Sequence, residues 1–426
     1  MKNQTRLAVL AALTLWMSHF VLGQATFSVV KVPGASANSY VAINDNGQVL
    51  LNTATTISNQ ISLWSRTGGS QSVALVGSNN GGAAINNSGQ VAGASGPNSS
   101  GNLEAFLWRA AAGSQWLGTL GSGFSVATGL NNAGAVVGQS YTSSYVQHAF
   151  LWTQTGSMQD LTPALVSIGG STAMGINASN QIAGYFFPSV AENTLGFLWT
   201  QAGGLQSFGS SGTLAYAIND PGTVVGQSTF ANGFKHAFSW TQAGGMNDLG
   251  TLGGPESAAL GISNRGWIVG TSLTSSGTGL LHGFLWTPAG GMQDLATVAG
   301  LSSNHQPYWV QVNNFGVIAM TSNLGGYLLI PKMSATFTSS ANPSVKGQPV
   351  TFTATLTSIA GPPPDGETVR FTFKGILLGT GTLKGGVASI TTPAMTVGSG
   401  TVFAVYSGDA NYLSTKYNAL VQVVNP

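Results

Sequence analysis

The stretch from His236 to Gly270, HAFSWTQAGGMNDLGTLGGPESAALGISNRGWIVG, is one copy of a unit that recurs along about three quarters of the chain. Two landmarks make the copies countable: an apolar run that ends in Trp, and a small-residue run that ends in an Ile-Asn-x-x-Gly type of turn. The Trp landmark falls at Trp64, Trp108, Trp152, Trp199, Trp240 and Trp286, with GYLLI around Leu329 as a seventh copy without Trp. The Asn landmark falls at Asn44, Asn86, Asn131, Asn177, Asn219, Ser263 and Asn313. A period of roughly 40–45 residues with several short strands per unit indicates a β-propeller.

Each unit is expected to form four strands. In the fifth unit, the alternation of apolar and polar residues predicts four half-buried strands. They are expected at Thr213–Ile218, Thr223–Ser228, His236–Trp240 and Met246–Gly250. Asn-Asp-Pro-Gly between the first two strands and Ala-Gly-Gly between the last two are typical of tight hairpin turns. The first strand of a unit is rich in small residues, which suits the innermost position, where neighbouring sheets converge.

The two ends of the repeat region predict how the ring closes. The seventh unit stops after its third strand, Gly326–Ile330, while Phe27–Val32 precedes the first unit and has no unit of its own. We therefore predict that Phe27–Val32 pairs with Gly326–Ile330 and completes the last sheet. Such a closure satisfies strand edges that would otherwise favour aggregation. The sequence thus predicts an all-β fold, with a seven-bladed β-propeller over residues 26–333 that is closed by its N-terminal strand.

The first 23 residues are typical of a signal peptide. Lys2 and Arg6 precede the apolar run LAVLAALTLWMSHFVL and the small-residue end VLGQA. The run of about 16 residues is short for a membrane span, so we expect export and no membrane insertion after cleavage. Without Lys2 and Arg6 the thirteen basic residues fall to eleven, equal to the eleven acidic ones, which argues against nucleic acid as a partner. The chain has no cysteine, so disulfides and thiolate metal sites are excluded.

A second domain is expected from Ser334 onward, where the repeat period stops and Trp no longer occurs. Seven short strands in residues 334–426 are the pattern of an immunoglobulin-like β-sandwich. They are expected at Ala335–Ser339, Pro349–Ser358, Thr368–Phe373, Ile376–Leu383, Val387–Thr391, Thr401–Tyr406 and Ala419–Val424.

Three histidines occupy the same position of the repeat, and each has an aspartate twelve residues later. The pairs are His148–Asp160, His236–Asp248 and His282–Asp294. A pair repeated in three units favours a hydrogen bond between strands of one sheet over catalysis, because chemistry is carried by single sites and not by equivalent ones. The spacing of the remaining carboxylates and histidines predicts no catalytic pair, no metal site and no cofactor.

The links between the second and third strands are long and unlike one another, and they carry aromatic residues. These residues are Tyr141, Tyr145, Phe186, Phe187, Phe230 and Phe234. Variable loops on a rigid frame are where binding usually occurs, and such rings suit stacking on sugars or peptides. The alternative is that the rings pack back over the edges of the sheets.

Two stretches resemble known families. HAFLWT at 148–153 and MNDLGTLGG at 246–254 resemble the HAF-repeat family of bacterial extracellular repeat proteins, and the resemblance spans residues 27–333. It implies export and a propeller-like array, and no activity. NPSV at 342–345 and YSGDANY at 406–412 resemble the bacterial Ig-like domain of group 3, over residues 334–426. That resemblance implies a spacer or adhesive unit of a bacterial surface protein.

Together these observations predict an exported, non-catalytic interaction or adhesion protein, secreted or at the bacterial cell surface. Its propeller loops would bind a carbohydrate or an extracellular protein. One alternative is a hydrolase or lyase that acts on polysaccharide, and another is a purely structural surface or matrix component. A catalytic propeller would need a concentrated acidic or His-rich rim, and the sequence does not predict one.

Overall fold

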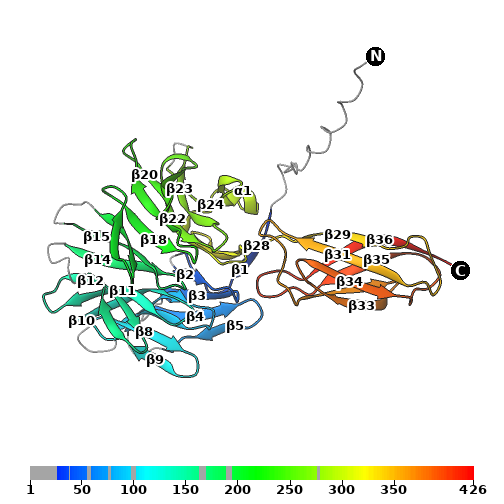
Figure 1. Ribbon diagram of the computed structural model, residues 1–426, viewed down its shortest axis with the longest axis horizontal. Coiled ribbons are helices and arrows are strands. Elements are labelled where there is room, and N and C mark those ends of the chain that lie inside the picture. The colour runs from blue at the N-terminus through cyan, green and yellow to red at the C-terminus, as the bar shows by residue number, and fades with distance from the viewer. Residues whose placement is uncertain are drawn as a thin grey trace, which may run out of the picture.

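The computed structural model describes residues 26–37, 39–54, 59–74, 78–96, 102–162, 169–188, 194–275 and 279–426. The predicted signal peptide, residues 1–23, lies outside the described residues. The repeat region forms seven four-stranded antiparallel sheets, which are arranged around a common centre (Figure 1). We number these sheets 1 to 7 in the order of their innermost strands.

Sheets 1 to 4 follow the chain directly. Sheet 1 consists of β2 (Val41–Ile43), β3 (Gln48–Ala54), β4 (Asn59–Ser65) and β5 (Gly69–Ser72). Sheet 2 consists of β6 (Ser78–Ile85), β7 (Val91–Gly96), β8 (Glu104–Arg109) and β9 (Gly113–Trp116). Sheet 3 consists of β10 (Gly121–Leu130), β11 (Val136–Thr142), β12 (Gln147–Thr153) and β13 (Ser157–Asp160). Sheet 4 consists of β14 (Gly170–Ile176), β15 (Ile182–Phe187), β16 (Leu195–Thr200) and β17 (Gly204–Phe208).

Sheets 5 to 7 repeat the same order, and a short helix precedes the last one. Sheet 5 consists of β18 (Leu214–Ile218), β19 (Val224–Thr229), β20 (Lys235–Thr241) and β21 (Gly245–Gly250). Sheet 6 consists of β22 (Gly253–Ile262), β23 (Ile268–Thr274), β24 (Leu281–Thr287) and β25 (Gly291–Asp294), and it is followed by α1 (Leu295–Ala299). Sheet 7 consists of β26 (Pro307–Val312), β27 (Ile318–Ser322), β28 (Gly325–Pro331) and β1 (Phe27–Val32).

Sheet 7 contains strands from both ends of the repeat region. β1 runs antiparallel to β28, with Phe27 opposite Pro331 and Val32 opposite Gly326. The predicted pairing of Phe27–Val32 with Gly326–Ile330 is therefore present. Because β1 leads directly into sheet 1, this pairing joins the last sheet to the first.

The core lies between neighbouring sheets. The third strands contribute fully buried phenylalanines, of which Phe150 on β12 is typical. Its ring lies over Gly138 on β11, where a Cβ would be 2.9 Å from the ring and 2.0 Å from the carbonyl oxygen of Val126. Glycine is needed at this position because any side chain would collide with the first strand.

The C-terminal domain is a sandwich of two sheets, coloured orange to red beside the ring in Figure 1. One sheet has the order β29 (Ser334–Ser339), β31 (Val350–Thr357), β34 (Val387–Thr392). The other has the order β30 (Ser344–Val345), β36 (Thr415–Asn425), β35 (Gly398–Tyr406), β32 (Thr368–Phe373), β33 (Ile376–Thr382). The seven predicted strands are all present. The additional strand β30 is two residues long and pairs in parallel with β36, so no alternating pattern marks it. The described part of the chain contains no helix with the length and hydropathy needed to cross a membrane.

Candidate functional site

The turns between the first and second strands meet at one face of the ring and form a circle of hydrogen bonds. The amide nitrogen of each landmark asparagine donates to the backbone oxygen of the landmark residue in the next sheet. The links run from Asn44 to Asn86 (2.8 Å), Asn86 to Asn131 (3.1 Å), Asn131 to Asn177 (3.1 Å), Asn177 to Asn219 (3.1 Å), Asn219 to Ser263 (3.0 Å) and Asn313 to Asn44 (3.1 Å). Ser263 has no side-chain amide, so the link from sheet 6 to sheet 7 is missing. We call this circle the asparagine belt and this side of the ring the belt face.

The belt explains why the landmark residue is asparagine. Each side chain also shapes its own turn: Oδ1 of Asn131 accepts from the backbone nitrogens of Ala133 and Ala135. Gly134 takes a φ of 82°, which completes the turn. An amide has the acceptor for the turn and the donor for the neighbouring sheet, and few side chains combine the two.

The belt surrounds a polar cavity of about 170 Å³. Asp45, next to the landmark Asn44, lies on its rim. Its carboxylate accepts from the backbone and side-chain nitrogens of Asn314 and from the side chain of Asn87. The negative charge of the Asp45-Asn46-Gly47 turn is therefore bound by side chains and backbone of the two neighbouring sheets. The C-terminal domain lies against this face, where the side chain of Asn411 donates to the backbone oxygen of Asp45 at 2.7 Å.

The first strands begin at the other side of the ring, which we call the open face, and partly exposed aromatic side chains gather there. They are Tyr40, Phe124, Tyr141, Tyr185, Phe187, Tyr308 and Trp309. They come from sheets 1, 3, 4 and 7. Six of them form three pairs of contacting aromatic rings: Tyr40 and Trp309 with centroids 4.8 Å apart, Phe124 and Tyr141 at 4.9 Å, and Tyr185 and Phe187 at 5.9 Å.

Tyr308 and Trp309 are the most exposed members of this group, at 47% and 37%. Tyr40 is held under Trp309, where its hydroxyl donates to the backbone oxygen of Ala83 at 2.6 Å and burial raises its pKa to about 12. Burial also raises the pKa of Tyr216, on the first strand of sheet 5, to about 12, with a smaller contribution from the neighbouring Tyr185. These hydroxyl groups are therefore neutral donors at physiological pH.

Uncharged polar groups accompany the aromatic rings. The Thr172 hydroxyl lies 2.9 Å from Oε1 of Gln139 and 2.8 Å from Nε2 of Gln147, so the two amides are held in place between sheets 3 and 4. Glu104 and Glu256 lie near the same ends of their strands but belong to sheets 2 and 6, which are not neighbours. The other carboxylates at this side, those of Asp160, Asp248 and Asp294, lie in the outermost strands and are each bonded to a histidine of the same sheet. The open face thus offers flat rings, hydroxyl groups and amides.

The structure places the six predicted loop aromatics in different surroundings. Tyr141 and Phe187 belong to the open-face group. Tyr145 is 78% exposed in the turn after β11, and Phe234 is 47% exposed in the turn after β19. Phe230 stacks on the His236 ring at 5.6 Å.

The prediction for Phe186 is wrong. This side chain is 7% exposed and packs in the core between sheets 3 and 4. Sequence reasoning placed Phe186 in a link between strands, but β15 continues to Phe187, and in a strand alternate residues face the core. Sequence reasoning also missed Tyr40, Tyr308 and Trp309, because it looked for binding residues in loops and not at the starts of the innermost strands.

The three His–Asp pairs lie within single sheets. Histidine Nδ1 is 2.8 Å from the carboxylate in His148–Asp160, 2.9 Å in His236–Asp248 and 2.7 Å in His282–Asp294. The twelve-residue spacing suggests that Phe150 faces Met158 and His148 faces Asp160, but this register is wrong by two residues, because Phe150 lies opposite Asp160 and Trp152 opposite Met158. The histidine therefore reaches the aspartate diagonally.

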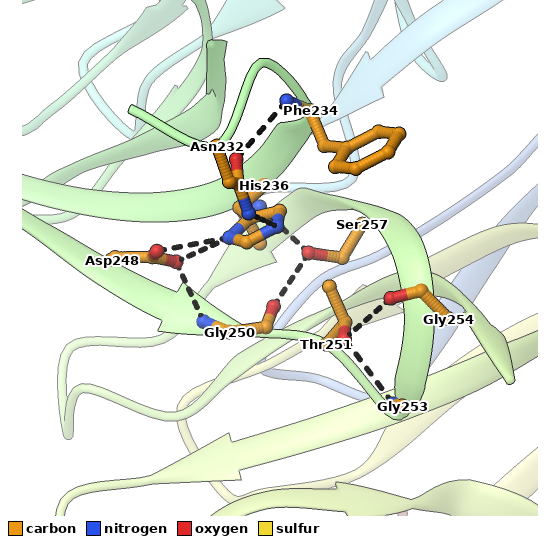
Figure 2. A network of polar contacts seen from close by, with 10 residues as sticks. Asn232, Phe234, His236, Asp248, Gly250, Thr251, Gly253, Gly254 and Ser257 are labelled. Atoms are coloured by element: carbon orange, nitrogen blue, oxygen red, sulfur yellow. Dashed lines mark hydrogen bonds and ion pairs between the residues drawn. The ribbon is translucent and has the colours of Figure 1, made fainter. Parts of the chain in front are cut away.

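Each aspartate also holds the chain where it leaves the fourth strand (Figure 2). The second oxygen of the Asp248 carboxylate accepts from the backbone nitrogen of Gly250, and the backbone oxygen of Gly250 accepts from the Ser257 hydroxyl in the next sheet. In sheet 2, Glu104 occupies the histidine position and its own carboxylate accepts from the equivalent backbone nitrogen, that of Gly118. One carboxylate thus replaces the pair, which fits a structural role for these residues.

A family model for the bacterial Ig-like domain of group 3 matches residues 337–425, so the C-terminal domain is an Ig-like domain of that group. The match does not extend to the ring, so the resemblance of residues 27–333 to the HAF-repeat family stays a prediction. No curated protein sequence matches this chain.

Several solved structures are similar to this chain at low sequence identity. A streptogramin B lyase is 13% identical, with 72% of this chain and 99% of that chain covered and a TM-score of 0.48. The β-propeller domain of the Trilobed protease from Pyrococcus furiosus is 10% identical, with 68% and 94% covered and a TM-score of 0.47. The extracellular domain of a putative hybrid two-component system from B. thetaiotaomicron is 9% identical, with 95% and 59% covered and a TM-score of 0.43.

Proposed function

We propose that this chain is an exported, non-catalytic binding protein that holds an uncharged glycan on the open face of a closed, seven-bladed propeller. The observation that carries the proposal is the contrast between the two faces. The belt face uses its polar groups on its own turns and on the Ig-like domain. The open face presents aromatic rings from four sheets to solvent.

The chemistry of the open face suits a sugar chain. The flat rings of Tyr308 and Trp309 provide apolar surfaces that combine with a polar edge, and such surfaces pack against the carbon–hydrogen faces of pyranose rings. The amides of Gln139 and Gln147 and the tyrosine hydroxyls supply the few placed polar groups that orient a ligand. Because the charges here are few and separate, an uncharged glycan fits better than an acidic one.

Three observations support the closed seven-bladed ring. The hydrogen bonds of the asparagine belt return from Asn313 to Asn44. β1 completes sheet 7, and seven four-stranded sheets surround the centre. The predicted signal peptide and the Ig-like domain support export and a location outside the cytoplasm. Glu104 and Glu256 belong to sheets that are not neighbours, which supports a binding role over glycoside hydrolysis, because hydrolysis needs two carboxyl groups within about 10 Å of each other.

The test is a binding screen of the chain from residue 26 to 426 against immobilised neutral and acidic polysaccharides and against bacterial and host extracellular proteins. We expect binding to one or more neutral polysaccharides. Trp309→Ala should weaken that binding at least about tenfold, as the loss of a central aromatic contact does. Tyr145→Ala is the matched control, because this aromatic ring is more exposed than Trp309 but lies in an outer turn. The affinity of the Tyr145→Ala variant for the polysaccharide should equal that of the unmodified chain.

Two results would contradict the proposal. One is binding to proteins or acidic polysaccharides alone. The other is neutral-glycan binding that Trp309→Ala leaves intact. Release of shorter sugars during incubation would instead favour the enzyme alternative.

A further inference from the structure

Three residues that depart from the repeat on the belt face, Arg66, Arg265 and Phe315, contact the Ig-like domain. Each turn of the belt has four residues, beginning with the landmark residue. Its third residue is a small side chain, Pro or Asn in five sheets, whereas in sheets 6 and 7 it is long, namely Arg265 and Phe315. Arg66 likewise occupies the position after the third strand where three other sheets carry glutamine. These three long side chains all lie where the second domain meets the ring, so we read them as shaped for that contact.

Two arginines bind backbone oxygens of the Ig-like domain. The Arg66 guanidinium donates to the backbone oxygens of Asp409 and Tyr412, the latter at 2.8 Å. The Arg265 guanidinium donates to the backbone oxygen of Ala360. Hydrogen bonds from a charged donor are about twice as strong as neutral ones. The arginines therefore hold two separate loops of the domain.

Asn411 of the Ig-like domain joins the asparagine belt. Its Oδ1 accepts from the Asn313 amide at 2.7 Å, and its Nδ2 donates to the backbone oxygen of Asp45 at 2.7 Å. The preceding Ala410 lies over Gly47, where a Cβ would be 2.9 Å from that of Ala410 and φ is 68°. Gly47 is thus required by the turn and by the contact.

Apolar packing seals the same interface. Ala360 is 3% exposed and lies in the core cluster that contains Trp267 of sheet 6. The Phe315 ring meets the Tyr412 ring edge-on at 6.4 Å. The interface therefore combines buried apolar groups with hydrogen bonds between polar ones, as a permanent contact between domains does.

The contacted sheets are those on either side of the place where the ring closes. The chain is continuous from β1 through all sheets to β28, and the pairing of β1 with β28 is the join between its two ends. The Ig-like domain is attached to the end of β28, and Arg66 and Asp45 lie in sheet 1, directly after β1. The domain also covers sheets 6 and 7, between which the belt lacks its link.

We propose that the Ig-like domain is a clamp that locks the propeller ring, and not a freely hinged spacer. The pairing of β1 with β28 is the first link between the two ends of the ring. The Ig-like domain adds a second link, because it follows β28 in the chain and binds Arg66 and Asp45 of sheet 1. The clamp blocks the belt face for other partners and leaves the open face as the side from which a ligand approaches.

The experiment cleaves the chain between the propeller and the Ig-like domain and measures whether the two domains stay bound to each other. A specific protease site is inserted between Lys332 and Ser334 of the full chain, the chain is cleaved, and gel filtration shows whether the two domains elute together. We expect the cleaved chain to remain one complex. The double variant Arg66→Ala/Arg265→Ala should dissociate at least about tenfold more readily, whereas Arg109→Ala, which removes an arginine bonded to Gln115 and Gln154, should not.

Hydrogen exchange of the uncleaved chain gives a second readout that does not depend on cleavage. In the double variant, the amides of β1 and β28 should exchange at least about tenfold faster, while those between β11 and β12 keep the rate of the unmodified chain. The proposal is overturned if the cleaved domains separate without any substitution. It is also overturned if the double variant leaves exchange at β1 unchanged or accelerates it equally in all sheets.

Discussion

The two faces of the propeller are built by the same four-stranded repeat, yet they differ in kind. On the belt face, each turn contributes nearly the same residues, because each asparagine must bond to its own turn and to the next sheet. On the open face, the links differ in length and composition, because nothing there has to match a neighbouring sheet. The units are thus most alike where a residue forms a hydrogen bond to the next sheet. Residues that form no such bond can differ between units, and a binding site can be built from them.

The largest expected effect tests this contrast directly. Asn131→Ala removes an amide that makes four hydrogen bonds, to Asn177, Asn180 and two nitrogens of its own turn, and leaves buried partners unsatisfied. We expect a loss of about 3 kcal/mol in the free energy of unfolding. Urea denaturation followed by circular dichroism measures it. On the open face, Trp309→Ala should cost less than about 1 kcal/mol, since its side chain is partly in solvent, and the contrast fails if the two losses are equal.

The missing belt link at Ser263 allows a substitution that should raise the free energy of unfolding, whereas Asn131→Ala should lower it. In its turn, the Ser263 hydroxyl accepts one hydrogen bond, from the backbone nitrogen of Trp267 at 3.2 Å. An asparagine side chain there would accept hydrogen bonds from two backbone nitrogens of the turn and would donate one to the backbone oxygen of Asn313. Ser263→Asn should therefore stabilise the chain by about 1 kcal/mol. The midpoint of thermal unfolding should rise by a few degrees, and Ser263→Ala should lower it. A lower midpoint for Ser263→Asn would show that sheets 6 and 7 are spaced too widely for a belt link.

The sequence predicted the fold more completely than it predicted the site, for a physical reason. Strand boundaries follow from alternation and turn chemistry, which are local, and the pairing of Phe27–Val32 with β28 follows from counting the strands of the repeat. The landmark asparagine was found as a turn signal, but its bond to the next sheet is a contact between residues more than forty positions apart. Trp309 and Arg265 depart from the repeat in the sequence, but their partners, Tyr40 and Ala360, are far from them along the chain, so no local pattern identifies them.

The His–Asp pairs provide a smaller test. Because the Asp248 side chain is 38% exposed, its bond to His236 is screened by solvent, and His236→Ala should cost no more than about 1 kcal/mol. Glycan binding at the open face should remain unchanged. A large loss of binding with little loss of stability would mean that the pair has a functional role after all. Thermal unfolding and the polysaccharide binding assay on the same variant separate the two outcomes.

The smallest expected effect concerns pH and reaches the belt face through the Ig-like domain. The pKa of Glu367 is raised to about 7, mainly by burial and in smaller part by the neighbouring Asp409, while the hydrogen bond from the Tyr406 hydroxyl acts against both. Asp409 accepts from the backbone nitrogens of Asn411 and Tyr412, so it shapes the loop that enters the belt. An ionised Glu367 would therefore repel the carboxylate that holds this loop.

The sign follows from the two states of the chain. Between the ordinary pKa of 4.5 and about 7, folded Glu367 keeps its proton while the unfolded residue has lost it. Stability therefore falls as pH rises through this interval and is constant above it. Because the group is partly exposed, we expect a decrease of only about 2 °C in the thermal midpoint between pH 5 and pH 8 from this residue. Glu367→Gln should remove that decrease, while Asp365→Asn, a change at an exposed carboxylate of the same domain, should keep it. Glycan affinity should not follow this pH dependence, because the loop and the open face lie on opposite sides of the ring.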